Sequence, residues 1–175
     1  GNIPDSEVFK LELLMKQAHV SIHDRTVVDA ALERAENTGA AAAAIELPDG
    51  KILTGKTSNL LGPSAALILN ALKDLAGIDH NLHVISPTAI EPIQKVKTQY
   101  LGSKNPRLHI DEILIALSIS SAANPAAQLA MEQLPKLKGC QVHTSVMLSS
   151  VDIKLFKKLG IQLTCEPKYE HNPIY

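Results

Sequence analysis

Aromatic residues are scarce in this chain: they make up 3% of its residues, and tryptophan is absent. So few aromatic side chains leave little material for the stacking platforms that hold single-stranded nucleic acids, or for aromatic cages. Positive charge is not in excess either, because 17 Lys and Arg residues stand against 18 Asp and Glu residues, a net charge of −1. Nucleic-acid-binding domains typically carry a basic surface. We therefore expect no nucleic-acid partner.

Cysteines and long apolar runs are also few. Two cysteines, Cys140 and Cys165, do not make a disulfide scaffold. Apolar stretches such as residues 40–44 and 113–117 are far shorter than the roughly 20 residues that span a bilayer. No charged, apolar-cored leader opens the sequence, so we expect a cytoplasmic protein with no membrane partner. Because the sequence begins with Gly1 rather than Met, we also expect it to be a piece of a longer chain.

Hydrophobic residues account for 45% of the 175 residues, which is enough for one domain with a sizeable core. Two helical patterns predict a helical hairpin over residues 1–38. Strands then alternate with helices, which predicts an α/β domain over residues 39–169, and residues 170–175 read as an irregular tail. The expected strands are residues 41–47, 51–57, 83–86, 142–148 and 161–165, with a buried helix at 63–76. This order predicts a three-layer sandwich with a mixed, mostly parallel sheet.

The densest polar stretch of the sequence holds the main candidate site residues. Arg107 offers a planar guanidinium that binds oxyanions through two hydrogen bonds, and Asn105 adds an amide. His109 is an acid/base candidate because imidazole titrates near neutral pH, with Asp111 or Glu112 to orient it. The alternative is a simple helix start, in which the two carboxylates complement the helix dipole and Arg107 pairs with one of them.

The string GKILTGKT, residues 50–57, satisfies the phosphate-loop pattern G-x-x-x-x-G-K-T. Its context favours a β-hairpin strand instead. Pro48 and Asp49 turn the chain before it, two large apolar residues occupy its middle, and no helix follows directly. Lys56 and Thr57 remain candidate anion-binding residues, because the end of a strand can direct them into a cleft.

Cys140 and His143 have the spacing C-x-x-H, and Cys165 can lie on a neighbouring strand. Residues three apart on a regular strand face opposite sides of the sheet, so we expect no metal site. His143 alone is a candidate ligand-binding residue, with a satisfied, partly buried histidine as the alternative.

Three stretches, residues 44–61, 101–117 and 130–167, resemble the C-terminal part of an uncharacterised bacterial family, the domain of unknown function eighteen-forty-six. The likeness runs from about Glu7 to Tyr169. Members of that family are longer, so the resemblance implies a preceding N-terminal domain with a glycine-rich, phosphate-loop-like segment. The family brings no established activity or cofactor.

The order of elements also resembles the cytidine-deaminase-like fold, in which a hairpin is followed by a buried helix. In that family a His or Cys ligand and a catalytic Glu open the buried helix, and Pro-Cys-x-x-Cys follows the next strand. The corresponding stretches, residues 63–66 and 87–90, read PSAA and PTAI and supply neither. The likeness therefore implies a zinc-free version of this topology.

These features lead to two functional hypotheses. In the first, the domain contributes an anion-binding surface, for phosphate or carboxylate, to a larger nucleotide- or phosphate-dependent enzyme. Arg107, His109 and Lys56 would then face the N-terminal domain of the same protein. In the second, the domain is a non-catalytic structural or oligomerisation module, whose apolar helices at 63–76 and 110–124 make contacts in a homo-oligomer. The sequence identifies no cofactor.

Overall fold

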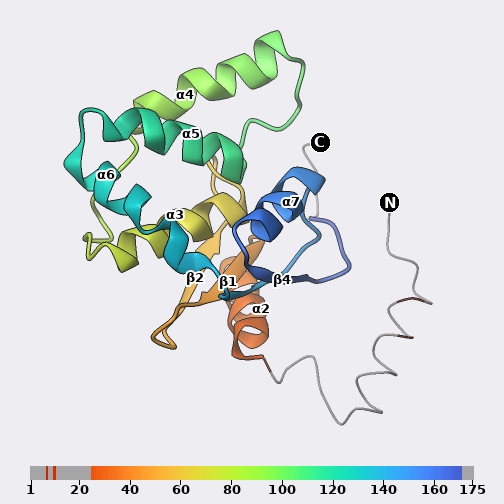
Figure 1. Ribbon diagram of the computed structural model, residues 1–175. Helices are drawn as coiled ribbons and strands as arrows, with labels where there is room; N and C mark the ends of the chain where they lie inside the picture. Colours follow the sequence, from red (N-terminus) through yellow and green to blue (C-terminus); the bar gives the residue numbers. More distant parts are fainter. Residues whose placement is uncertain (1–6, 8–9, 11–24, 171–175) are drawn as a thin grey trace.

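The computed structural model describes residues 25–170 together with Glu7 and Lys10. Six α-helices and four β-strands form this described part (Figure 1). The strands are β1 (Ala42–Glu46), β2 (Ile52–Lys56), β3 (Gln141–Thr144) and β4 (Gln162–Cys165). The helices are α2 (Thr26–Thr38), α3 (Pro63–Leu75), α4 (Pro87–Lys95), α5 (Ile110–Ser121), α6 (Pro125–Glu132) and α7 (Ser150–Lys158). Of the predicted N-terminal hairpin, α2 is described, and the first helix lies outside the described residues except for Glu7 and Lys10.

The sheet is mixed, with the strand order β2-β1-β3-β4. β1 pairs antiparallel with both β2 and β3, whereas β3 pairs parallel with β4. Residues 50–57 are expected from the sequence to belong to a β-hairpin rather than to a phosphate loop. The antiparallel pairing of β1 with β2, in which Ala42 lies opposite Lys56, confirms this. Because only β1 runs the other way, β2, β3 and β4 all end at the same edge of the sheet. The segments that follow these three strands therefore lie at one edge.

The prediction of a mostly parallel sheet is wrong at the level of strand pairs, since two of the three pairings are antiparallel. The strand expected at residues 83–86 does not form, and β3 pairs directly with β1. Val84 and Ile85 are nevertheless buried. The apolar signal that predicted a strand therefore reflects two side chains that reach the core from an irregular segment.

Helices cover both faces of the sheet, which gives the three predicted layers. Ala43 and Ile45 belong to the cluster beneath α3, while the intervening Ala44 packs with Val27 and Ala31 of α2. This is the alternation expected of a strand whose two faces are both covered. Figure 1 shows α2 and α3 on opposite sides of the strands.

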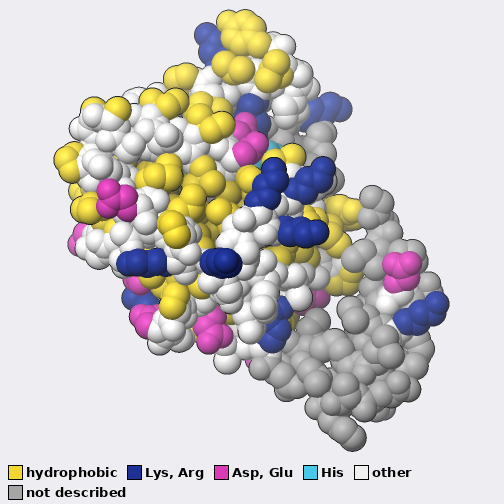
Figure 2. Space-filling model, in the orientation of Figure 1, with side chains coloured by type: hydrophobic (Ala, Val, Ile, Leu, Met, Phe, Trp, Pro, Cys, Tyr) yellow, Lys and Arg dark blue, Asp and Glu magenta, His cyan; other side chains and the backbone are white. Residues whose placement is uncertain are grey.

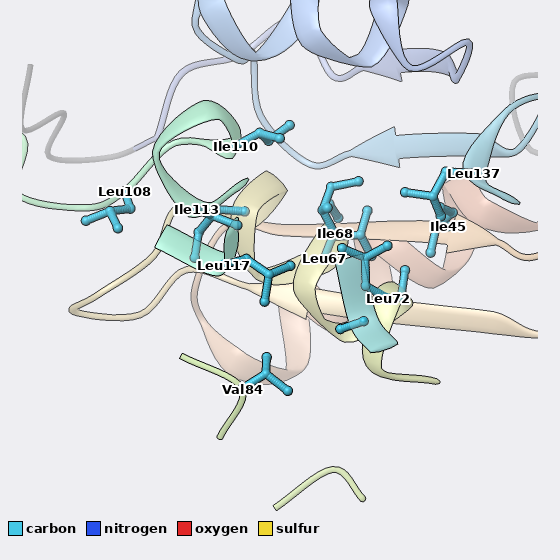
Figure 3. Close-up of a cluster of buried hydrophobic side chains, with 14 of the residues drawn as sticks. Ile45, Leu67, Ile68, Leu72, Val84, Leu108, Ile110, Ile113, Leu117 and Leu137 are labelled. Atoms are coloured by element: carbon cyan, nitrogen blue, oxygen red, sulfur yellow. The ribbon is translucent and has the colours of Figure 1, made fainter. Parts of the chain in front are cut away.

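The main core is built around α3. This helix buries apolar residues on most of its surface, as its sequence predicts, and each such Leu or Ile contributes about 1.5–3 kcal/mol. Figure 3 shows Leu67, Ile68 and Leu72 between Ile45 of β1 and Leu117 of α5. Within the described residues, no helix has the length and apolarity needed to cross a bilayer.

Candidate functional site

A small cavity lies where the N-termini of three helices meet. Gly62, His109 and Ser149 are the N-cap residues of α3, α5 and α7, and all three line this cavity, which has a volume of about 50 Å³. Residues that follow β3 and β4 also line it. Helix N-termini direct backbone N–H groups and the positive end of the helix dipole outward, so they favour anions. Ligands of open α/β sheets commonly bind beyond the carboxyl ends of the strands.

Short backbone contacts hold the opening of α3 beside the polar stretch that precedes α5. The Leu108 N–H donates to the Leu60 carbonyl at 2.9 Å, and the Gly62 N–H donates to the Leu108 carbonyl at 3.2 Å. The Asn105 side-chain oxygen accepts a hydrogen bond from the Arg107 N–H at 3.0 Å. These contacts bring Asn105, Arg107 and His109 to one cavity.

His109 is oriented by Asp152, a residue of α7. The Nδ1 of His109 lies 3.5 Å from Asp152 Oδ2, and the other Asp152 oxygen accepts a hydrogen bond from the Ile110 N–H at 3.1 Å. The Asp152 side chain is 7% exposed, so solvent screens this pair weakly. The hydrogen bond to Asp152 raises the pKa of His109, and burial opposes it in part. The sequence indicated Asp111 or Glu112 as the orienting carboxylate, and the structure places Asp152 there instead.

Asp111 and Glu112 act on the backbone that opens α5. Glu112 Oε1 accepts from the His109 N–H at 2.9 Å and from Lys97 Nζ at 2.8 Å. Lys97 Nζ also donates to the Arg107 carbonyl at 2.5 Å. Asp111 accepts from the Glu112 N–H at 2.9 Å. The helix-start interpretation therefore accounts for both carboxylates, and Lys97 is a buried support that the sequence did not single out.

Arg107 is held by one strong contact and one weak one. Its Nε donates to the Ser58 carbonyl at 2.8 Å. Within the described residues, its ion pair is with Glu170, 3.9 Å from a terminal nitrogen, and not with Asp111 or Glu112. A separation of 3.9 Å is at the outer limit of an ion pair. The terminal nitrogens of the guanidinium therefore keep the capacity to donate to an oxyanion.

Lys56 and Thr57 reach the same edge of the sheet but do not line the cavity. Lys56 is exposed. Thr57 is buried, and its hydroxyl has no hydrogen-bond partner in the described part of the chain. The Thr57 N–H donates to the Ala41 carbonyl at 2.8 Å, which ties the end of β2 to β1.

His143 lies elsewhere, on the face of the sheet beneath α2. It is fully buried, with Nδ1 2.6 Å from the Thr164 hydroxyl and Nε2 3.2 Å from Glu166. These contacts fit the alternative of a satisfied buried histidine. Cys140 Sγ donates to the Lys136 carbonyl at 3.7 Å.

Burial raises the pKa of Cys140 and that of Cys165, which keeps both thiols protonated at neutral pH. No group of three or more His, Cys, Asp or Glu side chains within the described residues is arranged to hold a metal ion.

The structure is that of an α/β domain with a small cavity at the edge of its sheet, lined by Arg107 and His109 together with Asp152 and Glu170. Residues 23–175 match the family described as "Domain of unknown function DUF1846, C-terminal". The chain belongs to this family, so the family resemblance seen in the sequence is confirmed.

Curated relatives carry the name UPF0371 protein. The chain is 54% identical to one from Corynebacterium efficiens over 99% of its own length and 35% of the relative. It is 47% identical to one from Streptococcus uberis, again over 99% of this chain and 35% of the relative. The chain thus spans about a third of the length of the curated relatives it matches.

Proposed function

We propose that this domain binds the anionic group of a small molecule, a phosphate or a carboxylate, in the cavity between α3, α5 and α7. The observation that carries the proposal is the meeting of Arg107 and His109 with three helix N-termini at one cavity. In the full-length proteins of the family, this cavity would serve a larger phosphate- or nucleotide-dependent enzyme together with the N-terminal domain.

Each polar group has a defined role in this proposal. Arg107 binds two oxygens of the anion through its terminal nitrogens, while Ser58 holds its Nε. His109, held by Asp152, adds positive charge at low pH and can transfer a proton to or from the bound molecule. Asp111 and Glu112, candidates for catalysis by sequence, support the backbone of the site rather than the reaction.

The proposal also includes the fold: the arrangement of the sheet and α3 is a zinc-free version of the cytidine-deaminase-like topology. The antiparallel β1–β2 hairpin followed by the buried α3 supports it. Cytoplasmic location likewise stays a prediction. Lys56, Thr57 and His143 stay candidate ligand-binding residues, for which the cavity itself offers no support.

The second hypothesis, a structural or oligomerisation module, rests on exposed apolar side chains. Ile115 and Ile119 on α5 are 60% and 71% exposed. Figure 2 shows apolar side chains spread over α4, α5 and α6 and basic ones over α7. Scattered exposed apolar residues are ordinary on protein surfaces, so this observation favours the second function less than the cavity favours the first. Homo-oligomers and the N-terminal domain stay predicted partners.

The proposal is tested by measuring the melting temperature of the 175-residue chain with and without inorganic phosphate or acetate. A ligand at about 100 times its dissociation constant adds about 2.7 kcal/mol to the free energy of unfolding. For a chain of this size that raises the melting temperature by roughly 5–10 °C. We expect this rise in the wild type and its loss in Arg107→Ala.

Lys104→Ala is the matched control. Lys104 is an exposed cation of the same segment and does not line the cavity. The Lys104→Ala variant should show the same rise in melting temperature as the wild type. If neither anion raises the melting temperature of the wild type, or if both variants lose the response equally, the cavity is not the anion site.

A further inference from the structure

A larger cavity, of about 520 Å³, lies beside the candidate anion site. The second half of α2 forms one wall through Leu32, Ala35 and Glu36, and residues 39–41, which join α2 to β1, form another. Residues that follow β3 and β4, among them Lys168 and Tyr169, close the remaining side. Small-molecule sites typically have volumes of about 300–1,000 Å³ and mix apolar walls with a few polar groups. This cavity has both properties.

The two cavities adjoin. Val146, which follows β3, and Glu170, which follows β4, line both of them. The smaller cavity, at about 50 Å³, has the room of one or two water molecules, each of which takes about 30 Å³ in the liquid. It can hold one small group, and the larger cavity can hold the rest of a molecule.

We propose that the two cavities together bind one organic anion, with a single phosphate or carboxylate beside Arg107 and a body of about nucleoside size against α2. This inference rests on the proposed function and specifies the class of ligand. The body would have an apolar ring or chain that packs on Leu32, Ala35 and Val146. Its hydrogen-bonding groups would reach Glu36, Lys168 or Tyr169.

The charged side chains that line the cavities limit the number of negative charges that the ligand can carry. Asp152 and Glu170 are carboxylates of the smaller cavity, and Glu36 and Glu170 are carboxylates of the larger one. Arg107, His109 and Lys168 balance them, so the lining has no large positive excess. A second or third phosphate would meet like charge without a further cation. The site should therefore favour a monophosphate or monocarboxylate over a di- or triphosphate.

Isothermal titration of the 175-residue chain with matched ligands tests this inference. The phosphate series is inorganic phosphate, adenosine monophosphate and ATP, and the carboxylate series is acetate and benzoylglycine. We expect the larger member of at least one series to bind about tenfold or more tightly than its head group alone, a difference of about 1.4 kcal/mol. Adenosine monophosphate should also bind more tightly than ATP. The series that responds identifies the head group.

Ala35→Trp separates the two cavities. Ala35 is partly buried and lines only the larger cavity, so an indole there would occupy the part of that cavity against α2 and leave Arg107 and His109 in place. The variant should bind the larger ligand about tenfold less tightly than the wild type does. Its affinity for the head group alone should be unchanged. Ala123→Trp, at an exposed position beyond α5, is the control and should change neither affinity. Thermal unfolding of each variant verifies its fold.

The outcomes distinguish this inference from the proposed function. If phosphate or acetate binds through Arg107 but the larger ligand binds no more tightly, or if Ala35→Trp has no effect, the two-cavity inference is wrong and the anion site stands. Binding of ATP as tight as that of adenosine monophosphate would also overturn the inference. If nothing in either series binds and Arg107→Ala changes nothing, both proposals fail.

Discussion

His109 is a residue whose ionisation the fold sets directly, because Asp152 stabilises its protonated form. The pKa of His109 is raised in the folded state above the value of about 6.5 that imidazole has in an unfolded chain. The pair therefore adds stability that is fully present below about pH 6.5 and is lost as the pH rises through the folded-state pKa.

The His109→Gln variant tests the direction of this pH dependence. The free energy of unfolding of the wild type should exceed that of the variant by more at about pH 5.5 than at about pH 8.5. Urea unfolding at the two pH values gives both differences. His83→Gln, at an exposed loop position, is the control and should show no comparable change between the two values. A difference for His109→Gln that grows with pH would contradict the assignment.

Asp152→Asn tests the cause of the raised pKa of His109. The hydrogen bond to Asp152 is its largest cause, while the charge of Glu112 contributes least. Replacing the carboxylate by an amide should therefore lower the pKa of His109 more than Glu112→Gln does. NMR titration of the His109 ring protons measures both. Equal shifts in the two variants would mean that Asp152 is not the dominant partner.

Gly55 fixes the contact between two elements, β2 and α3. A Cβ atom there would lie 2.4 Å from the Leu67 N and 2.7 Å from the Leu67 Cα, both backbone atoms of α3. Backbone atoms cannot rotate away, so Gly55→Ala should force the helix off the sheet and cost about 1–3 kcal/mol. At Gly62 the nearest atom to a new Cβ is the Leu108 oxygen at 3.7 Å, an ordinary contact.

Chemical denaturation of Gly55→Ala beside Gly62→Ala measures this difference. The second variant should unfold close to the wild type. Loss of stability in Gly62→Ala alone would contradict the packing argument. This contact also explains the second glycine of the string at residues 50–57: it admits α3 and does not form a phosphate loop.

The N-cap of α7 belongs to the candidate site as well as to the helix. The Ser149 hydroxyl accepts from the Asp152 N–H at 3.3 Å, and the Asn124 side chain caps α6 in the same way at 3.0 Å. Ser149→Ala and Asn124→Ala should each cost about 1 kcal/mol of stability. Only Ser149→Ala should also alter the pKa of His109 in an NMR titration, because it loosens the turn that holds Asp152. An equal change in both variants would contradict this.

Elements whose signals are local could be predicted from the sequence. Pro48 and Asp49 marked the turn of the hairpin, and the buried helix predicted at residues 63–76 corresponds to α3. The pairing of His109 with Asp152 could not, because it joins two helices far apart in the sequence. The Asp152 N–H donates to the Ser149 hydroxyl, while the Asp152 carboxylate contacts His109 and accepts from the Ile110 N–H.

At the scale of the molecule, the described residues bury more apolar side chains on one face of the sheet than on the other. The face beneath α3 joins a large core, to which α5, α6 and α7 also contribute. The face beneath α2 has a small buried cluster within the described residues, formed by Val27, Ala31 and Ala44. Arg25 adds polar contacts there. Its guanidinium donates to Gln141 at 2.8 Å, and other bonds reach Thr164 and two carbonyls of β3 and β4.

Segments with fewer buried contacts open at lower free energy than the core does. Hydrogen exchange should therefore be faster for the backbone amides of α2 than for those of α3, and Arg25→Ala should speed exchange in α2 without changing it in α3. Mass spectrometry of peptides from the two helices reads out both effects. Equal protection of α2 and α3 in the ligand-free wild type would contradict the prediction.

The same measurement links the packing of α2 to the larger cavity. Leu32, Ala35 and Glu36 form a wall of that cavity, so a ligand body placed there would add contacts to the helix with fewer buried side chains. Saturating adenosine monophosphate, or benzoylglycine if the carboxylate series binds, should then slow exchange in α2. Inorganic phosphate or acetate, which in this proposal occupies only the smaller cavity, should leave the exchange of α2 unchanged. Protection of α2 by the head group alone would mean that anion binding stabilises the whole sheet edge and that the wall formed by α2 plays no separate part.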